Sequence, residues 1–314
     1  MLKLSKSLVS QIPKVQGTLG KVTFSSSYTR QYSVSADEET KHFNHLAASW
    51  WDINGPQRIL HKMNLVRMDF IQQNITNSIS LNDKSTPQGE EVYVPGYNLN
   101  LLPKEISEQI LSDQKEKRTK EYEKLQLRCL DIGCGGGILS ESLARLPIVK
   151  SVNGLDLASE VVEIARKHKD LDPIIKNKIT YELKALESVN KDEMYDVVTM
   201  FEILEHVDQP GEFLKEGLSH LKKDGLLFLS TINKDFVSWF TTIFMGEYML
   251  GIVPVGTHHL EKYIDYKTLD NLMGQQKRFE VLSAKGGSYF PCYGWYLHSH
   301  PEFGNYFMAI KRIE

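Results

Sequence analysis

The sequence has few cysteines and no long apolar run, and both shortages narrow the classes of protein it can encode. Only three of its 314 residues are cysteine (Cys129, Cys134 and Cys292), and none has Cys-x-x-Cys spacing. An odd number of cysteines without Cys-x-x-Cys spacing argues against a disulfide framework and against a cysteine-based zinc site. We therefore expect the protein to work in a reducing compartment. No apolar stretch approaches the ~20 residues that a membrane-spanning helix needs. The chain is therefore not predicted to cross a membrane.

An excess of positive charge is also missing. The chain has 37 Lys and Arg against 40 Asp and Glu, a net charge of −3, whereas nucleic-acid-binding proteins normally carry a basic face. Nucleic acid is therefore not an expected partner. The apolar fraction of 41% and the charged fraction of 25% are ordinary for a globular protein. They exclude collagen-like, coiled-coil and wholly disordered chains.

The first 36 residues contain no acidic residue. They hold five Lys or Arg and eight Ser before the first acid, Asp37. A basic, hydroxylated, acid-free segment without a continuous apolar core is typical of a mitochondrial transit peptide, whose charge responds to a negative-inside membrane potential. The alternative is a disordered basic tail with no targeting role. We expect residues 1–36 to be a transit peptide, outside the fold.

The next segment has two parts. Residues 37–52 have the pattern of an amphipathic helix and residues 58 to about 74 that of a second, which predicts a helical cap over residues 37–75. Residues 76–126 combine prolines and glycines with a run of charged residues. We expect them to form an insertion, part loop and part solvent-exposed helix.

From residue 127 onwards, short apolar strands alternate with helices. The expected strands are 127–132, 152–157, 179–183, 195–201, 225–231, 279–285 and 305–312, and the expected helices are 138–145, 159–168 and 210–221. Such alternation predicts parallel βαβ units with helices on both faces. We therefore predict an α/β fold over residues 127–314, with a doubly wound, mostly parallel seven-stranded sheet.

A glycine-rich turn is the strongest local signal. Residues 130–137 read LDIGCGGG, so an expected strand ends at the glycines and an expected helix begins immediately after them. Glycine is needed where the backbone takes positive φ or where a ligand approaches without a Cβ in the way. The carboxyl edge of a doubly wound sheet is where ligands bind. A plain tight turn would not need four glycines in five positions, so we predict a ligand site here.

Two acids indicate which ligand the turn binds. Asp156, after the second strand, can accept both ribose hydroxyls of an adenosine, as in NAD and S-adenosylmethionine enzymes. A dinucleotide motif would have glycine where this chain has Ile138. Asp131 would repel a pyrophosphate but attract the ammonium of a methionine, directly or through water. We therefore favour S-adenosylmethionine on Gly133 and Gly135 over an NAD-dependent dehydrogenase.

This combination resembles the class I S-adenosylmethionine-dependent methyltransferases. The resemblance implies that Gly133 and its neighbours face the methionine part of the cofactor and Asp156 the ribose. It places the segment 185–187, which contains Leu186, near the adenine.

Two glutamates and a histidine follow the fourth expected strand. If a helical turn begins there, Glu202, Glu205 and His206 fall on one face, at i, i+3 and i+4. Two carboxylates and an imidazole form a three-point ligand set that leaves positions open for substrate. The set favours Mg²⁺, with Zn²⁺, Mn²⁺ or Co²⁺ as alternatives. The competing interpretation is a purely structural set of hydrogen bonds.

A divalent ion would suit methyl transfer to a phenol. A phenol with a pKa near ~10 is mostly protonated at neutral pH and is a poor nucleophile. An ion bound by two adjacent catechol oxygens would lower that pKa and orient one oxygen toward the methyl group. A general base could act without a metal, and His206, His258 and His259 are the candidates.

Several motifs resemble one family within this class, the ubiquinone-biosynthesis O-methyltransferases. They are Trp50-Trp51-Asp52 and the segments 60–67, 130–139, 202–207, 230–233 and 255–259. The resemblance covers about residues 37–312, except the insertion. It implies methylation of polyprenyl dihydroxybenzoate and demethylubiquinol intermediates. It further implies a peripheral protein on the matrix side of the mitochondrial inner membrane, within a ubiquinone-synthesis complex.

The same resemblance assigns roles to single residues. The expected contacts to S-adenosylmethionine are Arg67, Gly133, Asp156 and Phe201, and the expected metal ligands are Glu202, Glu205 and His206. Phe201 stands where the family often has Met, and a contact through its backbone would survive that change.

Residues 238–254 are intensely apolar and aromatic. They fit either a core helix or a surface patch, and the polyprenyl tail of the implied substrate favours a membrane-facing lid over residues 238–259. Two other functions stay open. One is a C-methyltransferase of a quinone ring, which requires no metal. The other is a non-catalytic methyltransferase-fold scaffold, against which the intact glycine turn and the Glu-Glu-His set argue.

Overall fold

The computed structural model describes residues 43–44, 46–79, 99–233, 264–290 and 293–314, all within one compact unit, Tyr32–Glu314. The expected transit peptide, the expected lid with His258 and His259, and Cys292 lie outside the described residues. So does the stretch 80–98 of the expected insertion. Within the described ranges, no helix is both long and apolar enough to span a bilayer.

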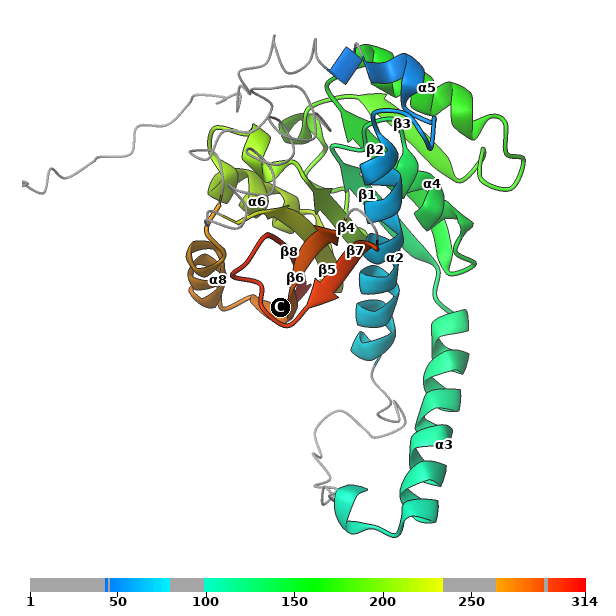
Figure 1. The fold of residues 1–314 in the computed structure, drawn as a ribbon, viewed down its shortest axis with the longest axis vertical. Helices are drawn as coiled ribbons and strands as arrows, with labels where there is room; N and C mark the ends of the chain where they lie inside the picture. The colour runs from blue at the N-terminus through cyan, green and yellow to red at the C-terminus, as the bar shows by residue number, and fades with distance from the viewer. Residues whose placement is uncertain (1–42, 45, 80–98, 234–263, 291–292) are drawn as a thin grey trace, which may run out of the picture. The chain divides into compact units, whose positions relative to one another are not determined.

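Eight strands form one sheet in the order β3-β2-β1-β4-β5-β8-β6-β7 (Figure 1). Their bounds are β1 Leu127–Ile132, β2 Val149–Asp156, β3 Ile179–Leu183, β4 Tyr195–Phe201, β5 Leu221–Ile232, β6 Phe279–Phe290, β7 Gly294–His298 and β8 Asn305–Arg312. Strands β1 to β5 pair in parallel, and β8 lies antiparallel between β5 and β6. The doubly wound, mostly parallel sheet is confirmed.

The sheet has one strand more than the seven expected. Strand β6 continues to Phe290, beyond the expected end at residue 285, and β7 then pairs antiparallel with it. Strand β7 begins at Gly294, whose φ of +85° favours glycine. The indole N–H of Trp295 donates to the carbonyl of Ile59 at 3.2 Å, so a contact distant in sequence supports this edge strand.

Along the chain, helices alternate with the strands, and four helices precede β1 in the described residues. Their bounds are η1 Ala47–Ser49, α2 Arg58–Ser78, η2 Leu99–Leu101, α3 Lys104–Glu123, α4 Ile138–Arg145, α5 Ser159–Lys169, η3 Leu186–Ser188, η4 Leu204–His206, α6 Pro210–Ser219 and α8 Tyr266–Gly274. Helix α8 was not expected from the sequence. It begins after Asp265, whose side chain accepts the backbone N–H of Thr268 as an N-cap.

The expectation of one helix over residues 37–52 is confirmed only in part, because residues 43, 44 and 46 are helical but the helix does not continue. Residues 47–49 form a short 3₁₀ turn, and the chain then turns away. The physical reason is tertiary: Trp50 is 6% exposed, because its ring packs against a distant part of the chain rather than along a helix face.

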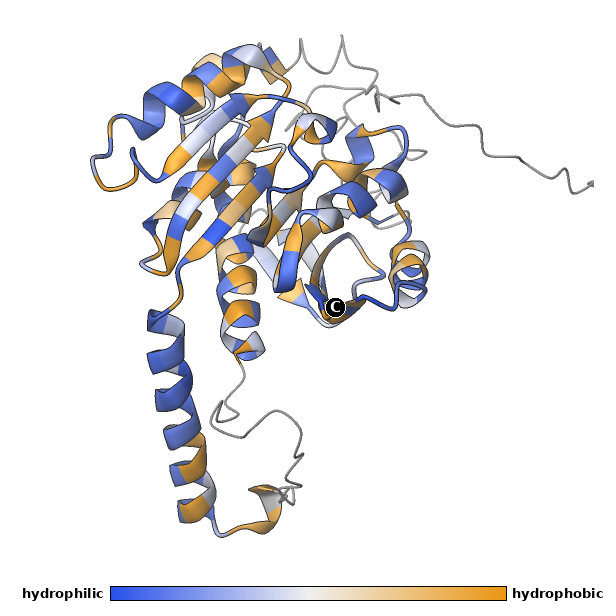
Figure 2. Ribbon diagram, turned by 180° about the vertical axis from the view of Figure 1, so that it is seen from behind, coloured by the Kyte–Doolittle hydropathy of each residue, from blue (hydrophilic) through white to orange (hydrophobic). Residues whose placement is uncertain are grey.

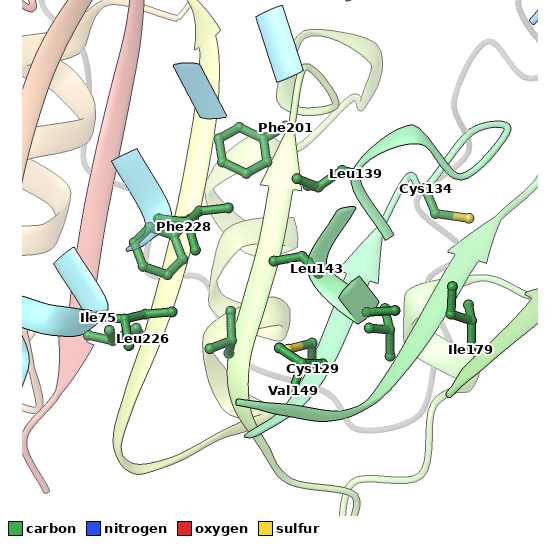
Figure 3. Packing of buried hydrophobic residues seen from close by; sticks show 14 of the residues in the cluster. Ile75, Cys129, Cys134, Leu139, Leu143, Val149, Ile179, Phe201, Leu226 and Phe228 are labelled. Atoms are coloured by element: carbon green, nitrogen blue, oxygen red, sulfur yellow. The ribbon is translucent and has the colours of Figure 1, made fainter. Parts of the chain in front are cut away.

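Two apolar cores fill the opposite faces of the sheet, because neighbouring residues of a strand point to opposite sides. On one face, α2, α4 and α5 pack against strand side chains such as Cys129. Figure 3 shows Leu139 and Leu143 of α4 in this core together with Phe228 of β5. On the other face, α6 and α8 cover Leu130 and its neighbours. Because helices cover both faces of the sheet, we expect polar side chains that can reach a ligand at the ends of the strands.

Helix α3 contributes to the cores only through Tyr122, which is partly buried against one of them. It has no buried residue, and Figure 2 shows it as hydrophilic along most of its length. Exposed ion pairs run along it, including Lys104 with Glu108 and Lys120 with Glu116. The sequence-based expectation of a solvent-exposed helix in this region is confirmed.

Candidate functional site

The predicted site residues gather at the carboxyl edge of the parallel strands. The glycine turn follows β1, Asp156 ends β2, and Glu202 follows β4. Because β1, β2 and β4 are parallel neighbours, their carboxyl ends meet at this edge, which is where doubly wound sheets bind ligands. Arg67 reaches the same region from α2, since the charges of Asp131 and Glu202 act on its guanidinium.

The backbone of the glycine turn adopts φ values that are unfavourable for residues with a Cβ. Gly133, Gly135 and Gly137 have φ values of +72°, +52° and +92°, in the left-handed region that glycine tolerates best. The turn is tied to β2, because the N–H groups of Gly133 and Cys134 both donate to the carbonyl of Leu155, at 2.8 and 2.9 Å.

Protein atoms crowd the glycines as well. A Cβ on Gly135 would lie 2.6 Å from the indole of Trp50, and one on Gly136 would also overlap that ring. A Cβ on Gly133 would overlap Ile203. The prediction that these glycines make room for a ligand is therefore incomplete, since Trp50 and Ile203 already occupy the space beside three of them.

Asp156 fixes the turn from the β2 side. Its Oδ2 accepts the N–H of Gly135 at 2.8 Å, and its Oδ1 accepts the N–H of Ala158 at 2.9 Å. Burial raises the pKa of Asp156, and these backbone donors oppose the shift. A carboxylate has about four lone-pair positions, so Asp156 can hold the turn and still accept hydroxyl groups of a ligand.

Asp131 lies behind the turn. It is 2% exposed, and its oxygens accept the hydroxyls of Thr199 at 2.7 Å and Ser140 at 2.5 Å. Burial raises its pKa, while both hydroxyls and the charge of Arg67 oppose the shift. Both oxygens are engaged by protein, so an attraction of Asp131 for a bound ammonium acts through the field or through water.

Arg67 is a buried cation beside these acids. It is 8% exposed, and its guanidinium carbon lies 5.0 Å from the centre of the Phe201 ring. Burial lowers its pKa, whereas the charges of Glu202, Asp131 and Glu205 raise it. Within the part of the chain that the structure describes, its Nε has no hydrogen-bond partner. An unpaired buried donor of this kind suits an anionic group of a ligand.

Glu202 and Glu205 lie beside β5 and β8. The Oε1 of Glu202 accepts the hydroxyl of Ser230 at 2.5 Å, and its Oε2 accepts the amide of Asn305 at 3.2 Å. Glu205 is 7% exposed and accepts the hydroxyl of Thr231 at 2.7 Å. Burial and the charge of Glu205 raise the pKa of Glu202.

The expected helical spacing of the Glu-Glu-His set is wrong. Glu202 has φ +51°, a strained value for a side chain larger than glycine, and it precedes the 3₁₀ turn η4. The three residues therefore do not share one α-helical face. His206 packs edge-on against Phe43, with ring centres 5.8 Å apart. Among the described residues, no group of three His, Cys, Asp or Glu has an arrangement ready for a metal ion.

The remaining predicted residues lie near the edge but point inward. Leu186 is 3% exposed and belongs to the core, so only its backbone is available to an adenine. Phe201 is 6% exposed and packs against Phe307. Leu157 and Leu183, which the sequence analysis missed, are 48% and 53% exposed at the ends of β2 and β3. The position of Leu157 directly after Asp156 was the available signal.

The sequence analysis also missed the residues that hold the acids in place. These are Ser140, Thr199, Ser230, Thr231 and Asn305. Ser230 and Thr231 lie in a motif that was noticed, but nothing in the local sequence indicated what they contact.

Comparisons with known proteins give the family. A family model described as a methyltransferase domain matches residues 100–284. The mitochondrial ubiquinone biosynthesis O-methyltransferase of Candida albicans is 52% identical, over 91% of this chain and 88% of that protein. Its namesake in Saccharomyces cerevisiae is 48% identical, over 91% of both chains.

Among solved structures, the chain is similar to magnesium protoporphyrin IX methyltransferase from Synechocystis PCC 6803 with bound SAH. That match has 18% identity and a TM-score of 0.46, and it covers 65% of this chain and 82% of that one. The family itself rests on the domain match and on the two fungal relatives, which extend over most of both chains. This chain belongs to the ubiquinone biosynthesis O-methyltransferases.

Proposed function

We propose that the protein transfers a methyl group from S-adenosylmethionine to a phenolic oxygen of catechol-type polyprenyl intermediates, polyprenyl dihydroxybenzoate and demethylubiquinol. The observation that carries the cofactor part of the proposal is the buried guanidinium of Arg67, with an unpaired Nε, at the edge that also holds the glycine turn and Asp156. One charged donor and one carboxylate suit the two polar ends of this cofactor.

The residues at the edge fit S-adenosylmethionine in chemical type. Arg67 would pair with the carboxylate of the methionine part and the backbone of Gly133 and Gly135 would lie beside it. Asp156 would accept the ribose hydroxyls, and the exposed side chain of Leu157 offers an apolar surface for the adenine. When bound, the cofactor supplies an electrophilic methyl group, and the chain's own residues hold and orient it.

We further propose that Glu202, Glu205 and His206 hold a divalent ion, Mg²⁺ or alternatively Zn²⁺, Mn²⁺ or Co²⁺. Their donor types fit such an ion. Their described orientation is not that of a ready site, because Ser230, Asn305 and Thr231 engage the carboxylates. Binding therefore requires these carboxylates to reorient. A bound divalent ion would lower the pKa of a phenol and align its oxygen.

A turnover assay with a short-chain catechol analogue tests this function. We expect an O-methylated product from S-adenosylmethionine, loss of turnover with a chelator, and recovery when Mg²⁺ or Zn²⁺ is added back. Full turnover in chelator would contradict the metal proposal and leave His206, His258 or His259 as candidate bases. A C-methylated product would contradict O-methylation. Absence of both product and cofactor binding would indicate a scaffold.

The substrate tail leads to a proposal about location. We propose a peripheral protein on the matrix side of the mitochondrial inner membrane, in a ubiquinone-synthesis complex, with residues 238–259 as a membrane-facing lid. The apolar sequence of this segment supports the idea, because an apolar and aromatic segment in an enzyme for a lipid-tailed substrate suits interfacial attachment. The two fungal relatives are both named mitochondrial.

Liposome flotation tests the lid. We expect a variant with Trp239, Phe240 and Phe244 changed to Ser to float much less than the unchanged protein on vesicles of inner-membrane lipid composition, because three apolar side chains would be lost from the proposed lipid contact. A variant with Ile106 and Leu111 changed to Ser is the matched control, since these apolar residues are exposed on α3. Equal flotation of all three proteins would contradict the lid.

A further inference from the structure

The Trp50-Trp51-Asp52 motif has no role in the function proposed above. Trp51 comes from the N-terminal segment, yet its indole N–H donates to the carbonyl of Gly136 at 2.9 Å. The two residues are 85 positions apart in the chain. The bond therefore joins the N-terminal segment to the middle of the glycine turn.

The indole of Trp51 is itself held in place. It stacks on the ring of His168 in α5, with ring centres 3.5 Å apart and planes 3° from parallel. The Nδ1 of His168 is hydrogen-bonded to Oε1 of Glu141 at 2.8 Å, and Glu141 is 1% exposed in α4. The N–H of Glu141 in turn donates to the carbonyl of Gly137 at 2.9 Å. These contacts connect Gly136 to Gly137 through the side chains of Trp51, His168 and Glu141.

The backbone that precedes Trp51 is fixed too. The Nε2 of His61 in α2 is hydrogen-bonded to the carbonyl of Trp50 at 2.9 Å, and its ring meets that of Trp51 edge-on at 5.7 Å. Trp50 lies against the bare backbone of Gly135 and Gly136. The tryptophan pair and Asp156 therefore all contact the same part of the turn, Gly135 and Gly136.

We propose that Trp51 is a positioning residue for cofactor binding: its hydrogen bond to Gly136, backed by the stack on His168, holds the glycine turn in the shape that receives the methionine part of S-adenosylmethionine. The inference rests on the proposed function, because it assumes that this cofactor binds at the turn. It assigns no contact between Trp51 and the cofactor.

The physical reason is the freedom of glycine. A run of glycines has more accessible backbone conformations than any other sequence, so an unrestrained turn would spend part of its time in shapes that do not bind. Asp156 fixes the N–H of Gly135 and Trp51 fixes the carbonyl of Gly136. With the peptide planes at both ends held, the one plane between Gly135 and Gly136 cannot rotate freely, and the binding shape dominates.

The test is calorimetric titration of S-adenosylmethionine into full-length protein, with turnover measured in parallel. Trp51→Phe removes the N–H donor but keeps a ring that can stack on His168. We expect a three- to tenfold larger Kd and KM for S-adenosylmethionine, on the order of one lost hydrogen bond, with kcat at saturating cofactor within about twofold. Trp295→Phe is the matched control, because Trp295 also donates its N–H to a backbone carbonyl, of Ile59.

The outcomes separate this inference from the proposed function. If the unchanged protein does not bind S-adenosylmethionine, the proposed function fails. If it binds and Trp51→Phe leaves Kd unchanged, or Trp295→Phe raises Kd equally, the positioning role of Trp51 is wrong. Should Trp51→Phe fail to fold, His168→Ala, which removes the stack but leaves the donor, decides the question in the same way: an unchanged Kd would overturn the inference.

Discussion

At the scale of single residues, the site is a group of buried charges that restrain one another. The charges of Asp131, Glu202 and Glu205 act on Arg67, and burial raises the pKa of Asp131 and of Glu202 because it disfavours their ionised forms. Hydroxyl donors from α4, β4 and β5 stabilise the ionised forms. Burial of these charges at the strand ends lowers the free energy of unfolding.

Replacement of Glu202 tests this balance. Its pKa is raised above the ordinary value of 4.5, so the folded protein binds this proton more tightly than the unfolded chain does. The ionised side chain therefore destabilises the fold increasingly as the pH rises from about 4.5 through the raised pKa. We expect Glu202→Gln to have a Tm equal to or about 2–4 °C above that of the unchanged protein near neutral pH, and no advantage in acid. Turnover should fall about a hundredfold, because Glu202 is a proposed metal ligand that orients the substrate.

Thermal melts across pH and the turnover assay measure both effects. Glu108→Gln on the exposed α3 is the control and should change neither quantity. A Glu202→Gln protein that is clearly less stable than the unchanged one at neutral pH would show that the carboxylate is instead a net stabilising group.

At the scale of elements, the junction of β1 and α4 carries the most constraint. Three glycines with positive φ turn the chain within five residues, and Gly137 is the residue before the first turn of α4. A Cβ on Gly137 would also overlap the hydroxyl of Tyr181, which packs beneath the turn. The backbone shape and the packing under it therefore require glycine independently of any ligand.

Two glycine substitutions compare this junction with a permissive element end. Gly137→Ala combines left-handed backbone with a steric overlap, and we expect a loss of about 2–4 kcal/mol in the free energy of unfolding. Gly274→Ala, at the end of α8, meets open space and should be neutral or stabilising by up to about 1 kcal/mol. Denaturant unfolding measures both. Equal effects would show that the turn is less constrained than its geometry indicates.

At the scale of the whole molecule, charge is divided unevenly along the chain. The first 36 residues carry five basic residues and no acid, although the whole chain has a net charge of −3. A membrane potential that is negative inside attracts only the basic part. We propose from this asymmetry that residues 1–36 act as a mitochondrial targeting signal and take no part in the chemistry of the enzyme.

Import into isolated mitochondria tests whether residues 1–36 are a targeting signal. A reporter carrying residues 1–36 should be imported only while the membrane potential is intact, and an uncoupler should abolish import. The matched control replaces the five Lys and Arg of this segment with Gln, which keeps its length and polarity but removes its charge. Import of that control at the original rate would show that charge is not the signal.

The sequence by itself determined the parallel core and the edge at which the site lies. The strands expected at 127–132, 179–183, 195–201 and 305–312 coincide with those observed, because short apolar runs bounded by turns depend mainly on local composition. The order of strands and helices then placed Asp156 and Glu202 at one edge, since parallel strands share their carboxyl end.

Only the tertiary structure decided which partners fill that edge. Trp50 against Gly135, Trp51 on Gly136 and Asn305 on Glu202 join positions far apart in the chain. The left-handed backbone of Glu202 and the additional strand β7 depend on such distant contacts as well. Local propensity acts over a few residues, whereas packing and hydrogen bonds between remote segments depend on the whole fold, so one sequence read along its length does not reveal them.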